Sequence, residues 1–214
     1  MAMVQNLAAV YEALRAVYGD AKWWPASAPY EVIAGAVLTQ NTAWSNVEKA
    51  LNNFAGRLSP EFVEKIPAGE LADIIRPAGF YNQKAASLKA VTAWFGKYGY
   101  SAENAAKQPL SALRPELLAV KGVGPETADS ILLYALGLPS FVVDAYTRRL
   151  LTRLGFEARL DYKSVKALFE SGLERDVYLY NNFHALIVIN AKLHCRARPL
   201  CGGCPLSGAC PGLV

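Results

Sequence analysis

Residues 118–128 read LAVKGVGPETA and lie between two segments with helical spacing of apolar residues. Two glycines that flank a small apolar residue allow a tight hairpin with positive φ angles and outward-pointing N–H groups. A helix that starts directly behind such a turn adds backbone donors that suit a phosphate. Lys121, Gly122, Val123 and Gly124 are therefore candidates for a phosphate contact, although an ordinary glycine-rich turn can have the same sequence.

About twenty residues further along, residues 141–149 read FVVDAYTRR. Asp144 follows an apolar run and stands at the start of an expected helix, where an aspartate commonly serves as the N-cap. A carboxylate at this place can alternatively be catalytic, close to a site where positive charge develops. The local sequence leaves both roles open.

All four cysteines lie near the C-terminus, at Cys195, Cys201, Cys204 and Cys210, in the pattern C-x5-C-x2-C-x5-C. In a chain without a secretion signal, such clustering favours metal or cluster ligation over disulfides. Zinc sites commonly pair two CxxC motifs, whereas this chain has one, and four thiolates from one short run suit an iron–sulfur cluster. We therefore expect a [4Fe-4S] cluster with a structural role, and zinc is the alternative.

Helical spacing of apolar residues dominates the rest of the chain, and sustained alternation with a period of two is absent. We therefore expect an all-α protein. The expected helices cover residues 4–17, 30–38, 44–54, 60–66, 71–75, 82–98, 115–120, 126–136, 145–154, 162–171 and 177–193. His184 and Lys192 would share one face of the last helix, and Tyr146 follows Asp144 closely; whether they contribute to a site is left open.

Composition indicates a globular protein of one large or two small domains. The chain has 214 residues, of which 53% are hydrophobic, and its net charge of +4 is a weak indication of an anionic partner. No apolar run approaches the ~18 residues needed to span a bilayer, so no membrane partner is expected. Because the N-terminal stretch lacks a signal-peptide pattern, we expect a cytoplasmic protein.

The hairpin, the later aspartate and the four-cysteine loop, in this order, resemble the helix-hairpin-helix (HhH-GPD) DNA glycosylases of the endonuclease III superfamily. Residues 29–50 (PYEVIAGAVLTQNTAWSNVEKA) look like an early barrel helix of that family, and residues 79–84 (GFYNQK) look like its G-L-Y-N-x-K turn. The first cysteine spacing is five residues where the family usually has six, a departure that concerns the geometry of the loop more than its four ligands.

The resemblance implies two helical domains. A six-helix barrel with the helix-hairpin-helix would cover residues 22–136, and an iron–sulfur cluster domain built from both termini would cover residues 1–21 and 137–214. The implied partner is double-stranded DNA containing a damaged base, which is flipped out of the duplex into a cleft. We expect a monomer that is associated with the nucleoid when it is bound to DNA.

In this family, residues of two turns fill the space that the flipped base leaves. By resemblance, Gln40 or Asn41 is the candidate plug and Phe80 is the candidate wedge, while the hairpin holds a backbone phosphate. The alternative is that these residues are two polar loop residues and one buried aromatic.

Asp144 matches the family's catalytic aspartate, which stabilises the oxocarbenium character of the sugar and can orient or deprotonate the attacking water. Family members that also cut the strand carry a lysine just before the T-A of the hairpin helix, and its amine forms a Schiff base with the sugar. Glu126 occupies this position here. Because a carboxylate cannot form an imine, the resemblance predicts a monofunctional glycosylase without AP-lyase activity.

Four residues are candidates for the base pocket: Trp23, Trp24, Pro25 and Trp44. Core packing is the ordinary role of a tryptophan, but a proline-rich loop is a poor place to bury two indoles. Electron-rich rings favour a cationic base by ~1–2 kcal/mol, and methylated purines carry such a charge. The set also resembles the 3-methyladenine glycosylase III branch, so we expect an alkylated purine such as 3-methyladenine as the substrate.

Two alternative functions are also compatible with the sequence. One is an endonuclease III-like glycosylase for mismatched or oxidised pyrimidines. The other is a non-catalytic DNA-binding module that senses damage. Release of a base that the Asp144→Asn substitution abolishes would distinguish an enzyme from such a module.

Overall fold

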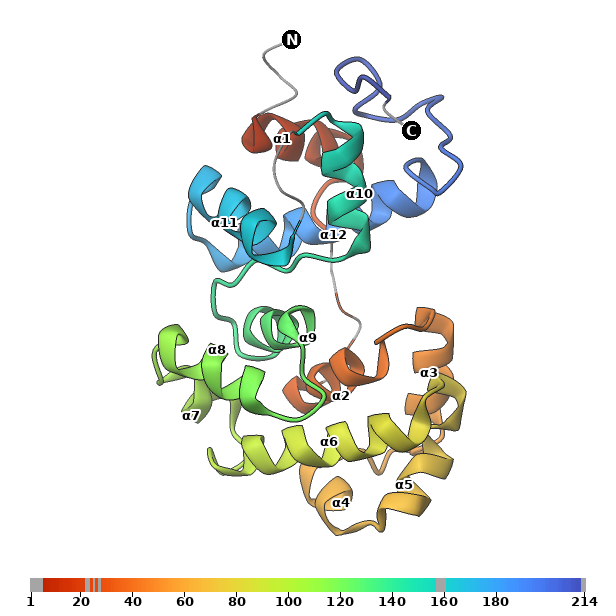
Figure 1. Cartoon of the computed structure of the whole chain (residues 1–214), viewed down its shortest axis with the longest axis vertical. Coiled ribbons are helices and arrows are strands. Elements are labelled where there is room, and N and C mark those ends of the chain that lie inside the picture. Colours follow the sequence, from red (N-terminus) through yellow and green to blue (C-terminus); the bar gives the residue numbers. More distant parts are fainter. Residues whose placement is uncertain (1–5, 22–23, 25, 27, 157–160, 213–214) are drawn as a thin grey trace. The chain divides into compact units, whose positions relative to one another are not determined.

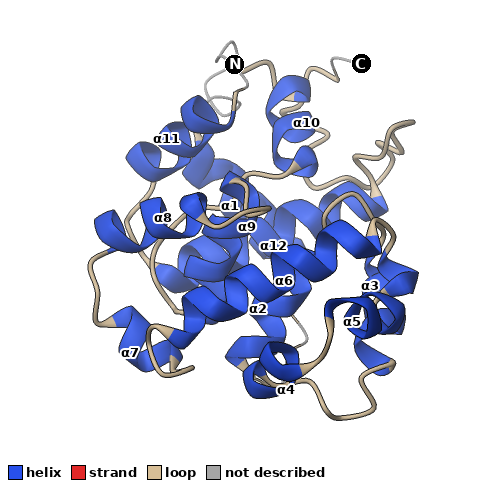
Figure 2. Ribbon diagram, turned by 60° about the horizontal axis from the view of Figure 1, so that its bottom comes forward, coloured by secondary structure: helices blue, strands red, loops and turns tan. Residues whose placement is uncertain are grey.

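The computed structural model describes residues 6–21, 24, 26, 28–156 and 161–212. Within them it has twelve α-helices, a 3₁₀ turn (η1), a π-helical segment (η2) and no strand, which confirms the all-helical prediction for this part of the chain (Figure 1, Figure 2). None of the described helices is long and apolar enough to cross a membrane.

The chain divides into two compact units, Trp24–Leu138 and Met1–Trp23 with Pro139–Val214. The first unit contains α2 (Pro29–Leu38), α3 (Trp44–Asn52), α4 (Pro60–Lys65), α5 (Ala68–Ile74), η1 (Arg76–Ala78), α6 (Tyr81–Gly96), α7 (Ala102–Ala106), α8 (Leu110–Ala119), α9 (Pro125–Ser130) and η2 (Ile131–Ala135). The second unit contains α1 (Leu7–Tyr18), α10 (Ala145–Arg153), α11 (Tyr162–Gly172) and α12 (Val177–Leu193).

Helix α2 forms the centre of the Trp24–Leu138 unit. Every residue from Val32 to Leu38 is buried, because small and aliphatic side chains cover the whole circumference of the helix. Helix α6 packs against α2, α4 and α5, and Figure 1 shows it between α2 above and α4 and α5 below. This long helix therefore supports loops that come from several parts of the unit.

Helix α12 is the corresponding buried helix of the other unit, where it packs against α1 and α10. An aromatic cluster fills the space beside it: Phe141 stacks on Phe169 with ring centroids 4.0 Å apart, and Tyr180 and Phe183 meet Phe141 edge-on. All four side chains are fully buried. The segment that leads into α10 is therefore anchored in the core of this unit.

The region between α6 and the hairpin differs from the predicted pattern. We expected a single helix over residues 115–120, started by Pro115, but α8 begins at Leu110 and Pro115 lies inside it. Leu113 and Leu117 are both fully buried and lie one turn apart, so their packing outweighs the hydrogen bond that an internal proline removes. Helix α7, which Ser101 caps, was not predicted because it is only five residues long.

Candidate functional site

The glycine-containing turn between α8 and α9 forms the predicted hairpin. Gly122 has a φ of +85°, and the N–H of Val123 donates to the carbonyl of Val120 at 3.0 Å. Val123 is buried and anchors the turn, whereas Lys121, Gly122 and Gly124 are exposed. The expectation of positive φ at both glycines is wrong for Gly124, which has a φ of −89° because it already serves as the N-cap of α9.

The hairpin lies directly against helix α6. A Cβ atom added to Gly122 would lie 1.9 Å from the Oγ of Ser87, which is much closer than any real contact. Position 122 therefore requires glycine for two reasons, its left-handed backbone and the close approach of α6. This close packing fixes the distance between the hairpin and α6.

The loop after α2 is hydrogen-bonded to the same hairpin. The Nε2 of Gln40 donates to the carbonyl oxygen of Gly122 at 3.0 Å and to the Oγ1 of Thr127 at 2.9 Å. The next residue, Asn41, is exposed and has a left-handed backbone with a φ of +51°. The two candidate plug residues thus lie in different environments, one bonded to the hairpin and one in solvent.

Phe80 is the most exposed large apolar side chain among the described residues, with 64% of its surface accessible. It has a φ of +46°, which is unfavourable for a residue with a Cβ, and it directly precedes α6. An exposed aromatic on a strained backbone is typical of a functional site. The alternative expectation of a buried aromatic is wrong for this residue.

Glu126 lies in the first turn of α9, where its side chain is exposed. Its neighbours Thr127 and Ala128 are buried, and Thr127 accepts the hydrogen bond from Gln40. The Glu126 carboxylate is therefore at the surface, next to the hairpin.

Three aromatic rings of the Trp24–Leu138 unit lie together. Trp24 stacks on Tyr134 with centroids 5.1 Å apart, and it meets Trp44 edge-on at 5.5 Å. The indole of Trp24 also lies over Gly35, where an added Cβ would be 3.2 Å from its Cζ2 atom. Tyr134 was missed by the sequence analysis because it lies far along the chain, in the π-helical segment η2. Trp23 and Pro25 lie outside the described residues.

Asp144 is the N-cap of α10. Its Oδ1 accepts hydrogen bonds from the backbone N–H of Thr147 at 2.7 Å and from the Oγ1 of Thr147 at 2.9 Å. Its other oxygen, Oδ2, lies 3.4 Å from the Nε2 of His184 on α12. The capping role is therefore real, and it engages only one of the two carboxylate oxygens.

The surroundings of Asp144 keep its carboxyl group ionised. Burial acts to raise the pKa of Asp144, but the charge of His184 beside it and the hydrogen bonds from Thr147 outweigh burial, so its pKa lies below the usual value. An ionised carboxylate offers about four acceptor positions; the two bonds from Thr147 occupy those of Oδ1, whereas Oδ2 faces the Nε2 of His184 at the longer distance of 3.4 Å. The arrangement fixes the side chain and leaves Oδ2 capacity for one further partner.

Tyr146 and Lys192 are each linked to the cysteine loop, residues 195–210, through an arginine side chain. The guanidinium of Arg149 lies 5.1 Å from the centroid of the Tyr146 ring, and its Nε donates to the carbonyl of Cys195 at 2.7 Å. Lys192 is exposed, and its carbonyl accepts from the Nε of Arg196.

The four cysteines line one cavity of about 80 Å³ and form no disulfide with one another. The Nη1 of Arg153, a buried guanidinium, lies 3.1 Å from the Sγ of Cys195. The Sγ of Cys210 contacts the carbonyl of Arg153 at 3.3 Å, and the Sγ of Cys204 faces the Oδ1 of Asn190 at 3.6 Å.

The spacing of these thiols bears on the kind of centre they suit. Among the described residues, no group of three or more His, Cys, Asp or Glu side chains is arranged to hold a metal ion. A tetrahedral zinc with Zn–S bonds of about 2.3 Å requires its sulfurs about 3.8 Å apart. A [4Fe-4S] cluster instead takes each thiolate at a different iron, so its ligands stand further apart around one cavity. Four cysteines that line one cavity are a ligand set that either centre can use.

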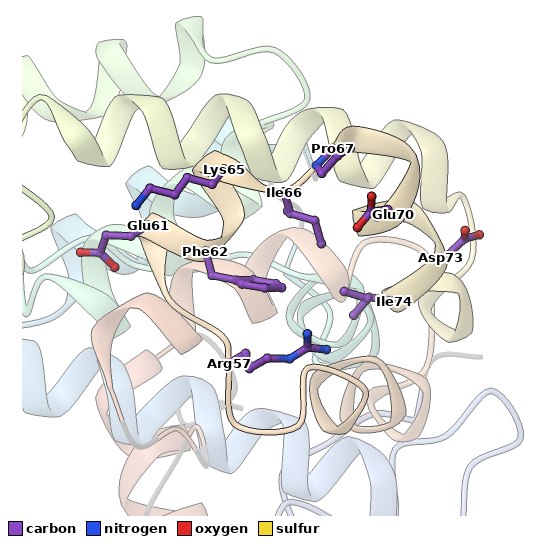
Figure 3. A pocket seen from close by; sticks show the side chains of 9 residues that line it. All are labelled: Arg57, Glu61, Phe62, Lys65, Ile66, Pro67, Glu70, Asp73 and Ile74. Atoms are coloured by element: carbon purple, nitrogen blue, oxygen red, sulfur yellow. The ribbon is translucent and has the colours of Figure 1, made fainter.

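A second cavity, of about 600 Å³, lies along α4 and α5, and none of the predicted site residues is among those that line it (Figure 3). Phe62, Ile66 and Ile74 point toward one another in it (Figure 3). The charged residues around it are of both signs: Arg57, Lys65, Glu61, Glu70 and Asp73. Because three of these five side chains are acidic and two are basic, this cavity is unsuited to a phosphate backbone.

Comparison with known proteins places this arrangement in a family. Residues 34–175, more than half of the chain, match HhH-GPD, described as "HhH-GPD superfamily base excision DNA repair protein". The "Putative DNA repair glycosylase MJ1434" of Methanocaldococcus jannaschii is 48% identical over 200 residues, which are 91% of each chain. Endonuclease III of Sulfolobus acidocaldarius is 28% identical over 180 residues, which are 82% of this chain and 78% of that one.

Two solved structures are similar as well. The H. pylori 3-methyladenine DNA glycosylase MagIII, bound to 1,N6-ethenoadenine, is 33% identical, with a TM-score of 0.77 over 87% of this chain and 97% of that one. A trapped covalent intermediate of endonuclease III with DNA is 25% identical, with a TM-score of 0.81 over 99% and 97%. The chain therefore belongs to the HhH-GPD superfamily of base excision DNA repair proteins, as a DNA glycosylase.

Proposed function

We propose that this protein is a monofunctional DNA glycosylase that hydrolyses the N-glycosidic bond of an alkylated purine flipped out of duplex DNA. The observation that carries the proposal is Asp144, an ionised carboxylate fixed by Thr147 and His184 with acceptor capacity left on Oδ2. Cleavage of this bond develops positive charge on the sugar, and a fixed anion stabilises that charge without reorganisation. The same oxygen can orient the attacking water and accept its proton.

The aromatic group supports an alkylated purine as the substrate. Trp24, Trp44 and Tyr134 present electron-rich rings in the same unit, and such rings attract a cationic base. The base of a 3-methyladenine nucleotide carries a positive charge in DNA and departs as a neutral molecule, so its release needs little help from a general acid. The similarity to MagIII, a 3-methyladenine glycosylase, supports the same choice.

The loops of the Trp24–Leu138 unit supply the contacts with DNA in this proposal. Backbone N–H groups of the hairpin at Lys121–Gly124 bind a phosphate, while Phe80 and either Gln40 or Asn41 enter the duplex. The exposure of Phe80 and the left-handed backbones of Phe80 and Asn41 support these roles. Base flipping places the lesion in reach of groups that act on the sugar.

Glu126 supports the absence of lyase activity. In strand-cutting relatives a lysine at this position forms the Schiff base, and a carboxylate has no amine to form one. The endonuclease III relatives are similar in sequence and structure, so mismatched or oxidised pyrimidines are the second candidate substrates.

The four cysteines would hold a [4Fe-4S] cluster that fixes the C-terminal loop, and zinc is the alternative. The cluster supplies structural constraint when it is bound, and the hydrolysis itself uses Asp144 and water. A broad absorbance near ~400 nm with bound iron in the purified protein would support this assignment. Stoichiometric zinc without that absorbance would overturn it.

The experiment that tests the function compares substrates directly. Wild-type protein is incubated with three duplexes, one methylated, one with a thymine–guanine mismatch and one with oxidised pyrimidines, and the free bases are separated by chromatography. We expect release of 3-methyladenine from the methylated duplex in preference to the other two. Preferred release of thymine or of oxidised pyrimidines would favour the second candidate, and no release from any duplex would favour a DNA-binding module.

A further inference from the structure

Lys84, in the first turn of α6, is a buried lysine with an unusual pair of partners. Only 2% of its surface is accessible, and burial lowers the pKa of its ammonium group. The Nζ donates to the carbonyl oxygen of Leu38 at 2.8 Å and to that of Ala78 at 2.7 Å. Withdrawing an ammonium group from water is costly, so these two bonds must be strong for the lysine to be retained there.

The two carbonyls mark the ends of two separate helices. Leu38 is the last residue of α2, and Ala78 is the last residue of η1. Carbonyls at the C-terminus of a helix lack an intrahelical partner and carry partial negative charge, so one ammonium group satisfies both ends. Lys84 thereby joins segments that are 40 residues apart in the sequence.

A loop with a left-handed, non-glycine residue follows each of these helix ends. Asn41 comes three residues after Leu38, and Phe80 comes two residues after Ala78. In the proposed function, these two loops enter the DNA duplex. The distance between the two loops depends on where each one leaves its helix. Lys84 bonds the carbonyl oxygen at each of these two points, Leu38 and Ala78.

The same part of α6 also supports the hairpin. Ser87, one turn after Lys84, lies beneath Gly122, and Gln40 donates to the carbonyl of Gly122. Lys84 and Ser87, in the first two turns of α6, therefore contact the segments that carry all three proposed DNA-contacting loops.

We propose that Lys84 is a positioning residue for base flipping, which fixes the spacing between the plug loop at residues 39–42 and the wedge loop at residues 79–80. The inference rests on the proposed function, because it takes these loops to enter the duplex. An ammonium group bonded to both carbonyls resists any separation of the loops, since each bond lies out of water where its loss is expensive.

Lys89 provides a matched control on the same helix. Its Nζ also donates to two backbone carbonyls, those of Val63 at 3.0 Å and Glu64 at 3.2 Å. These carbonyls belong to α4, which leads into neither proposed DNA-contacting loop. Loss of Lys89 removes the same kind of contact without changing the spacing of plug and wedge.

The experiment uses the full chain with Lys84→Met or Lys89→Met. The substrate is a methylated oligonucleotide paired either with a full complement or with a complement that has a tetrahydrofuran abasic analogue opposite the lesion. An unpaired lesion is easier to flip, so accurate loop spacing matters less for it. We expect Lys84→Met to slow single-turnover release of 3-methyladenine about 30-fold on the paired lesion and less than about 3-fold on the unpaired one.

Lys89→Met should leave both rates close to those of the wild type. Equal slowing of Lys84→Met on both substrates, or the same rates as Lys89→Met, would overturn the proposal. If Lys84→Met loses its helical circular dichroism, Lys84→Gln takes its place, because the amide can still donate to one carbonyl, and the same selective slowing is expected.

A second readout separates this inference from the proposed function. A duplex with 2-aminopurine beside a tetrahydrofuran site fluoresces more when an inserted side chain unstacks the base. The wild type and Lys89→Met should raise the fluorescence, and Lys84→Met should raise it less. If the wild type releases no base from any substrate, the proposed function fails, whereas the fluorescence still decides the role of Lys84.

Discussion

The two units of the chain use hydrogen-bonded polar side chains against different partners. In the Trp24–Leu138 unit, Lys84 and Gln40 donate to backbone carbonyls and so tie loops together. In the other unit, Asp144 accepts from Thr147 and faces His184, so the contacts fix one side chain. The first arrangement determines the shape of a surface, and the second determines the position and charge of one group.

This difference predicts two kinds of defect. Substitutions in the loop-tying residues should change how the protein engages DNA, with an effect that depends on how well the lesion is paired. Substitutions around Asp144 should change the rate of bond cleavage to the same extent on every substrate. Each of the following substitutions tests one side of this comparison.

The largest effect is expected for Asp144→Asn. Asparagine caps a helix about as well as aspartate, so the melting temperature and the affinity for DNA should change little. The negative charge is lost, and single-turnover base release should fall on the order of 10³-fold on paired and unpaired lesions alike. A decrease of less than about tenfold would show that another group carries the chemistry.

Gly122→Ala tests the hairpin side of the comparison. The new Cβ would meet Ser87, and alanine is unfavourable at a φ of +85°, so we expect a loss of about 2–4 kcal/mol in the free energy of unfolding and weaker DNA binding. Gly124→Ala is the matched control, because Gly124 has an extended backbone and no atom within 4 Å of an added Cβ. Urea denaturation and fluorescence anisotropy with abasic DNA measure the two effects, and equal behaviour of both variants would contradict the geometry.

A smaller effect is expected for His184→Gln. Glutamine keeps a donor near Asp144 but removes the imidazole, so base release should slow by roughly 3- to 10-fold with unchanged DNA affinity. Tyr180→Phe is the control on the same helix: Tyr180 meets Phe141 edge-on as His184 does, but it makes no contact with Asp144 among those described. Equal rates for both variants would mean that His184 serves only the packing of the aromatic cluster.

Local sequence was sufficient to locate the hairpin, the capping aspartate and the cysteine loop. Each of these features depends on neighbours within a few residues, as in the contact of Asp144 with Thr147. The exposure of Phe80 could not be predicted in the same way, because an aromatic before a helix is equally compatible with a buried position.

The contacts that organise the site join residues that are far apart in the sequence. Gln40 reaches Thr127, Lys84 reaches Leu38, and Asp144 faces His184. No pattern of charge or periodicity in a single sequence encodes such pairs, since they depend on how the helices pack. Lys84 in particular reads as a surface residue of the GFYNQK stretch until its burial is known.

The measurement that tests the central claim most directly follows the DNA strand itself. An end-labelled methylated duplex is incubated with the wild-type protein, and the strands are resolved before and after treatment with alkali. We expect free methylpurine to appear while the strands remain intact until alkali is added, because Glu126 supplies no amine. Strand breaks at the methylated positions without alkali would contradict a monofunctional glycosylase and show that another amine of the chain attacks the sugar.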